Sequence, residues 1–173
     1  MMRIKRLHAT FGATILACVL TPNLAPAMQT ASPPPLVDAF AETCRRGFPD
    51  LQIVRQSALA AGWVEASPEA VASEAQGTAP LSLFRKGPWT LFLTGPGPDG
   101  SSQSCRVAGT VEGDLPIGQL ASAASLALGV GQAQFSRSSG AELARWRSDP
   151  STLVQASVSR TPRSASLQVR VNR

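Results

Sequence analysis

Apolar side chains follow a helical period in the first half of the chain and a strand period in the second. Leu36, Phe40 and Cys44 are spaced four residues apart, which places them on one face of a helix expected from residue 36 to 46. A second apolar stripe predicts another helix from residue 51 to 61. The chain is therefore expected to begin its fold with helices.

Two more helical segments are predicted further along. Ser67 followed by Pro68 is a typical helix start, so a short helix is expected to continue to about Ala75. Apolar positions between residues 117 and 128 share one side of a helix that Gly129 would end. This last helix interrupts a region in which the period changes to two.

From residue 81 onwards, apolar and polar residues alternate as they do in strands with one buried and one solvated face. The segments expected to form strands are 81–85, 89–94, 102–112, 141–148, 152–160 and 165–171. Clean alternation is typical of antiparallel sheets. We therefore predict an α+β fold, with N-terminal helices packed on a mainly antiparallel sheet of about six strands and one inserted helix.

The first 27 residues have the order of segments found in a secretory signal peptide. A basic start precedes an uncharged, mostly apolar run over residues 9–20, and Ala25-Pro26-Ala27 supplies small residues for a signal peptidase. The run is shorter than the roughly 20 residues of a spanning helix. We expect cleavage near Ala27 and a periplasmic or secreted bacterial protein. The alternatives are an uncleaved anchor and lipidation of Cys18, whose preceding residues loosely match a lipobox.

Cleavage would leave a short leader and one domain. Removal of 27 residues from 173 leaves 146, which suits a single domain with its own core. Residues 28–35 are polar and end in three prolines, so we predict a flexible leader there and a single α+β domain over residues 36–173. The formal net charge of +5 falls to +2, because the signal contains three basic residues and no acidic one.

The amino-acid composition excludes several catalytic mechanisms. The only histidine, His8, lies in the predicted signal, and the chain has no tyrosine. Histidine is the usual proton-transfer group near neutral pH, so Ser-His-Asp and Cys-His catalysis and histidine metal sites are excluded from the mature chain. The sequence also has no phosphate loop or nucleotide-binding fingerprint. We expect no cofactor and no metal.

Two cysteines, Cys44 and Cys105, remain after cleavage. An even number of cysteines in an oxidising compartment predicts a disulfide. Cys44 lies on an apolar helix stripe and Cys105 shares a strand face with Val107, so both should reach the core. A bridge that closes about 60 residues is worth roughly 4 kcal/mol in the chain-entropy model. Two buried free thiols or a redox pair are the alternatives, and no C-x-x-C spacing supports the second.

Arginines gather near the C-terminus. Residues 137–173 contain seven arginines and two acidic residues, whereas residues 28–136 contain six basic and nine acidic residues. The strand phase places Arg145, Arg147 and Arg170 on the polar faces of their strands. If these strands pair, the three guanidinium groups form a candidate anion-binding face. The alternative is an ordinary solvated face in an arginine-rich protein.

Carboxylates offer the only other candidate chemistry. Glu112 and Asp114 are close in sequence, and Glu65, Glu69 and Glu74 form a second group. Paired carboxylates can hydrolyse glycosides. The first pair also fits a plain turn, and the second group fits a solvated helix, so a catalytic residue is not assigned.

Three short motifs carry a resemblance: Phe40-x3-Cys44, Ala58-x3-Gly62-Trp63 and Cys105-x-Val107. With them, the N-terminal half resembles small exported proteins of Gram-negative bacteria that have no assigned activity. The resemblance implies a periplasmic location and transfers no catalytic residue.

These patterns favour a non-enzymatic binding or envelope-interaction module. The expected partner is an acidic envelope protein or an anionic surface. Nucleic acid is not expected, because the protein is predicted to be exported and lacks a stacking motif. The alternative function is a small hydrolase that uses carboxylates only.

Overall fold

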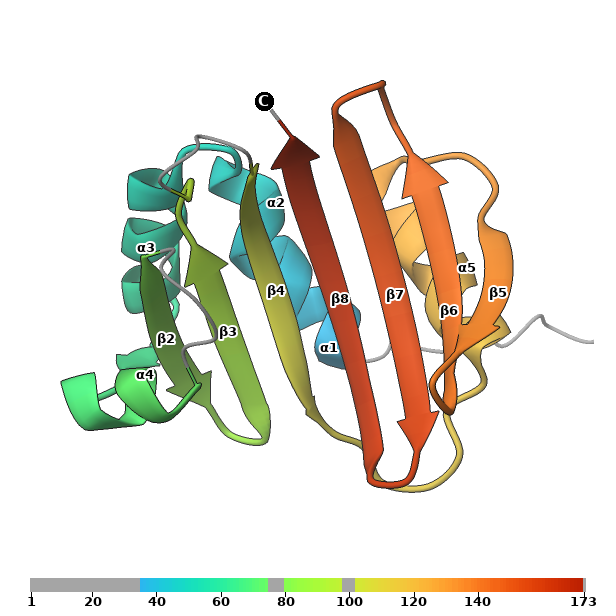
Figure 1. The fold of residues 1–173 in the computed structure, drawn as a ribbon, viewed down its shortest axis with the longest axis horizontal. Coiled ribbons are helices and arrows are strands. Elements are labelled where there is room, and N and C mark those ends of the chain that lie inside the picture. The colour runs from blue at the N-terminus through green and yellow to red at the C-terminus, as the bar shows by residue number, and fades with distance from the viewer. Residues whose placement is uncertain (1–34, 75–79, 98–101, 173) are drawn as a thin grey trace, which may run out of the picture. The chain divides into compact units, whose positions relative to one another are not determined.

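The computed structural model describes residues 35–74, 80–97 and 102–172. Its centre is an antiparallel sheet of eight strands in the order β1-β2-β3-β4-β8-β7-β6-β5 (Figure 1). The α+β class is therefore confirmed, whereas the prediction of about six strands was too low. The predicted signal peptide, Cys18 and residues 28–34 of the predicted leader lie outside the described residues.

Strand bounds follow the alternating pattern closely except at the two edges of the sheet. The strands are β1 (Val64–Glu65), β2 (Leu81–Lys86), β3 (Trp89–Thr94), β4 (Ser102–Thr110), β5 (Gln134–Ser138), β6 (Ala141–Arg147), β7 (Thr152–Arg160) and β8 (Arg163–Asn172). The two strands that the sequence did not predict, β1 and β5, are the edge strands. Both are exposed along their whole length, so neither shows the alternation that reveals a half-buried strand.

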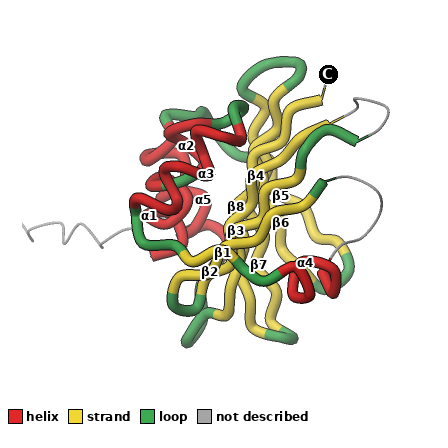
Figure 2. Tube along the Cα trace, turned by 90° about the vertical axis from the view of Figure 1, so that its left-hand side faces the viewer, coloured by secondary structure: helices red, strands yellow, loops and turns green. Residues whose placement is uncertain are grey.

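Helices lie on both sides of the sheet, but unequally. The helices are α1 (Pro35–Glu42), α2 (Cys44–Gly47), α3 (Leu51–Ala60), α4 (Pro68–Glu74) and α5 (Ile117–Leu128). Figure 2 shows α1, α2, α3 and α5 on one side and α4 on the other. We call the side covered by the four helices the inner face and the opposite side the outer face.

The first helix differs from the prediction at both ends. It begins at Pro35, one residue inside the segment predicted as leader, where proline suits the first turn because it has no N–H to leave unpaired. The helix expected to continue to residue 46 is interrupted at Thr43, which separates α1 from α2. The Thr43 hydroxyl donates a hydrogen bond to the Ala39 carbonyl at 2.8 Å. A threonine that bonds the preceding turn in this way often bends a helix.

The core lies between the inner face and the helices. Alternate residues of each central strand point inward, and α1, α3 and α5 supply the opposing side chains. Fully buried members include Leu36, Phe40, Val54, Phe84, Leu91, Val107, Leu120 and Leu167. The polar positions of the same strands are thereby directed to the outer face.

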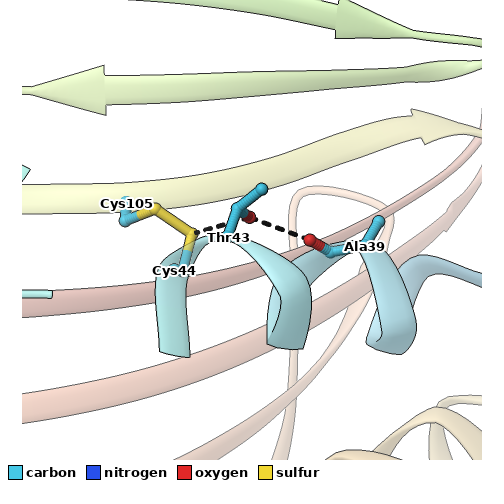
Figure 3. Close-up of a disulfide and its surroundings, with 4 residues drawn as sticks. All are labelled: Ala39, Thr43, Cys44 and Cys105. Atoms are coloured by element: carbon cyan, nitrogen blue, oxygen red, sulfur yellow. Dashed lines mark hydrogen bonds between the residues drawn. A yellow bond between two sulfur atoms is a disulfide. The ribbon is translucent and has the colours of Figure 1, made fainter. Parts of the chain in front are cut away.

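A disulfide crosses from the helix layer to the sheet. Cys44, at the start of α2, and Cys105, in the middle of β4, are both fully buried, and their sulfur atoms are 1.94 Å apart (Figure 3). The predicted pair thus lies at disulfide distance. Their sequence separation is 61 residues, so the bond closes a long loop that includes α3, α4, β2 and β3.

We predict that the double variant Cys44→Ala/Cys105→Ala loses about 2–5 kcal/mol of unfolding free energy, because the open chain gains entropy when it unfolds. Urea unfolding at equilibrium measures this loss. Reduced wild-type protein is the matched control and should show a loss of similar size. An unchanged midpoint in both samples would contradict a stabilising bridge.

Candidate functional site

The register of the sheet brings the three predicted arginines to one face. Arg147 and Arg170 both lie opposite Leu153 of β7, and Arg145 lies opposite Gln155 in the next row. Directly opposite residues in antiparallel strands point to the same side. All three arginines are exposed and lie on the outer face, which is turned toward the viewer in Figure 1.

The other side of the same strands is buried. Trp146 of β6 lies opposite Val154 of β7, which in turn lies opposite Val169 of β8, and all three are at most 9% exposed. The Trp146 indole N–H donates a hydrogen bond to the Ser125 hydroxyl of α5 at 2.9 Å. Packing against α5 therefore directs Trp146 inward and its neighbours, Arg145 and Arg147, outward.

The outer face carries more arginines than sequence reasoning assigned to it. Arg106 of β4 lies opposite Gln168, and Arg85 of β2 lies opposite Thr90. With Arg145, Arg147 and Arg170 they make five arginines, and the described outer-face positions of β2 to β8 contain no acidic residue. The alternation of β4 around Cys105 predicts the direction of Arg106, but only the pairing of β4 with β8 brings Arg106 to the same face as Arg170.

The five arginines differ in how far contacts within the protein already engage their guanidinium groups. The Arg106 guanidinium lies over the Phe92 ring, 4.2 Å from the ring centroid, and burial lowers its pKa while the charge of Glu74 opposes that shift. The Arg145 Nε–H donates a hydrogen bond to the Gln155 side-chain oxygen at 3.0 Å. The terminal N–H groups of the Arg145 guanidinium are not used in this bond. Among the described residues, Arg147 and Arg170 make no ion pair. We call Arg145, Arg147 and Arg170 the arginine face.

The acidic residue nearest in sequence to the arginine face is already engaged. Asp149 follows β6, and its carboxylate accepts hydrogen bonds from the Ser151 N–H, the Ser151 hydroxyl and the Thr152 N–H at 2.7–2.8 Å. These bonds lower the pKa of Asp149 to about 2. The carboxylate therefore organises the β6–β7 turn and forms no ion pair with Arg147.

A pocket lies at the end of the sheet, away from the arginine face. It has a volume of about 470 Å³ and forms where the β5–β6 turn, the β7–β8 turn and the segment after β4 meet. Asp114 and Glu142 are among its lining residues, and Glu142 accepts a hydrogen bond from Arg137 at 2.8 Å. Of the Glu112–Asp114 pair considered in the sequence, only Asp114 is among the residues that line this pocket.

The other predicted carboxylates do not contribute to this pocket. Glu65 of β1 pairs with Arg55 of α3 at 2.8 Å. Glu69 and Glu74 lie on α4, and hydrogen bonds to a backbone amide and to Ser67 lower the pKa of Glu69. These three residues therefore have structural or solvated roles in the described part of the chain.

Comparison with protein-family models, curated proteins and solved structures finds no match to this chain. Within the described ranges, no helix combines the length and the apolar character needed to cross a membrane. The same residues contain no group of three or more histidine, cysteine or acidic side chains that could hold a metal ion. Among the described residues, the arginine face and the pocket at the end of the sheet are the two candidate binding sites.

The pKa of Asp149 predicts an acid-dependent contribution to stability. Its folded-state pKa, about 2, lies below the ordinary value of 3.8, so the stabilisation is present above pH 4 and is lost as the pH falls toward 2. Asp149→Ala should therefore unfold at lower urea concentration than wild type at pH 7, and the difference should be clearly smaller at pH 2, where about half of the Asp149 carboxyl groups are protonated in the folded state. A difference that is the same at both pH values would contradict the turn geometry.

Proposed function

We propose that this protein is exported to the periplasm or the cell exterior and acts there as a non-enzymatic binding module. Its arginine face contacts an anionic envelope partner. The observation that carries the proposal is the placement of Arg145, Arg147 and Arg170 on one exposed sheet face without a neighbouring acidic strand residue. An acidic protein surface and an anionic envelope surface both present the charges that this face complements.

The chemistry of the face suits an extended partner. Guanidinium groups bind carboxylate and phosphate oxygens through paired N–H donors. Leu153 lies between Arg147 and Arg170, and the rows beside it on β7 and β8 are polar: Gln155 lies opposite Gln168, and the Ser157 and Ser166 hydroxyls bond each other at 2.8 Å. Exposed charges of this kind contribute mainly to orientation and to the rate of association, and salt screens them.

Export is supported by the segment order of residues 1–27 and by the buried cysteine pair. Disulfides persist in oxidising compartments and are rare in the bacterial cytosol. A non-enzymatic role is supported by the absence of histidine after His8. These points agree with the resemblance to exported proteins of Gram-negative bacteria.

A carboxylate hydrolase is the second candidate, because Asp114 and Glu142 line the same pocket. Most glycoside hydrolases use a pair of carboxyl groups that flank the bond to be cleaved. Release of reducing sugar from a glycan panel by the wild type, and its loss in Asp114→Asn/Glu142→Gln, would support this candidate. No release by the wild type would contradict this candidate.

Processing provides the first test. Protein recovered from the periplasm should have the intact mass of a chain that starts at Met28, less two hydrogens for the disulfide. A mass that includes residues 1–27, or a diacylglyceryl group on Cys18, would contradict the proposed cleavage.

The arginine face provides the second test. The triple variant Arg145→Glu/Arg147→Glu/Arg170→Glu should bind anionic envelope components at least about tenfold more weakly, since attraction becomes repulsion. Affinity capture from envelope extracts at several salt concentrations measures the loss. Raising the salt should release the same components from the wild type.

The matched control changes the net charge equally on the exposed side of helices α2 and α3, outside both arginine groups, with Arg45→Glu/Arg46→Glu/Arg55→Glu. This control should retain most of the capture. Equal loss in both triple variants would show that net charge, and not the arginine face, determines binding. Unchanged capture by the first variant would contradict the proposal directly.

A further inference from the structure

The pocket at the end of the sheet contains a second group of arginines, made by two hairpin turns. Ser139 and Gly140 join β5 to β6 with positive φ angles of 50° and 78°, as a two-residue turn of type I′ requires. Arg160 and Arg163 close the β7–β8 hairpin beside it, because β6 and β7 are neighbours. The Val111 N–H donates to the Arg163 carbonyl and brings the segment after β4 to the same place.

The strand phase places this group on the inner side of the sheet. Arg160 lies two residues after buried Val158, and Arg163 lies two residues before buried Ala165. Arg137 lies opposite Glu142. The pocket therefore faces away from the arginine face, and a ligand bound there does not compete with a partner on the outer side.

The charges in the pocket are not balanced by the protein alone. Arg137 pairs with Glu142 at 2.8 Å, but Arg160 and Arg163 are direct cross-strand neighbours and make no ion pair with a described residue. Like charges directly opposite each other destabilise a sheet. An anion between the two guanidinium groups removes that repulsion and uses their paired donors.

The remaining lining residues indicate what else the ligand carries. Asp114 and Glu142 accept hydrogen bonds, and Ser138, Ser139 and Ser159 both donate and accept. Carboxylates beside the arginines disfavour a bare, highly charged anion but suit the hydroxyl groups of a sugar. A volume of about 470 Å³ lies within the range of small-molecule sites.

We propose that this pocket binds a small hydroxylated anion, either a sugar phosphate or a sugar acid. Arg160 and Arg163 bind the acid group. Asp114 and Glu142 accept hydrogen bonds from the hydroxyl groups. The site is independent of the arginine face, so either proposal can fail without the other.

Isothermal titration of the purified protein with four probes tests the proposal. Glucose 6-phosphate and glucuronate represent the two acid groups. Glucose lacks the acid group, and inorganic phosphate lacks the sugar. At least one acidic sugar should bind about tenfold more tightly than both glucose and phosphate. The preferred probe identifies the acid group as phosphate or carboxylate.

Two variants with equal charge loss separate this site from general electrostatics. Arg160→Gln/Arg163→Gln should weaken the acidic sugar at least about tenfold, whereas Arg145→Gln/Arg147→Gln on the outer face should change it less than about twofold. If the first variant does not fold by circular dichroism, Arg163→Gln alone takes its place. The proposal is overturned if no acidic sugar binds more tightly than glucose and phosphate, or if the pocket variant binds as the wild type does.

Discussion

The register of the antiparallel sheet is the constraint on which both arginine groups depend. A slip of one residue in any strand would move its apolar residues to solvent and its arginines into the core. Cys105 fixes the phase of β4, because its bond to the helix layer requires it to point inward. Pairing then carries that phase across the sheet, from Cys105 to Val169, from Val169 to Val154, and from Val154 to Trp146. The outward direction of Arg170 follows from the same pairing.

The two arginine groups have different physical settings, although both lie on strands β5 to β8. The arginine face occupies a side of the sheet on which α4, the one described helix there, contacts β2 near the opposite edge. Its charges remain in water, where salt screens them. The pocket arginines are also exposed, but they line a pocket together with the hairpin turns and the Asp114 segment. A concave site favours a small ligand, whereas the flat arginine face does not.

Alternation predicted the central strands and the phase of Arg145, Arg147 and Arg170, because those segments have one buried and one exposed face. It could not reveal β5, whose residues are all exposed, and whose strand character comes only from pairing with β6. The pocket was not predictable either. Arg137 and Arg163 are 26 positions apart, and only the order of the strands brings their hairpins together.

We propose that the arginine face is the surface that contacts the anionic partner. Modification with phenylglyoxal, read by mass spectrometry, tests it on the unaltered protein. Free protein should react at Arg145, Arg147 and Arg170, and addition of the captured envelope partner should protect these three while Arg46 on α2 continues to react. Protection of Arg46 with continued reaction at the arginine face, or equal reaction with and without the partner, would contradict the account.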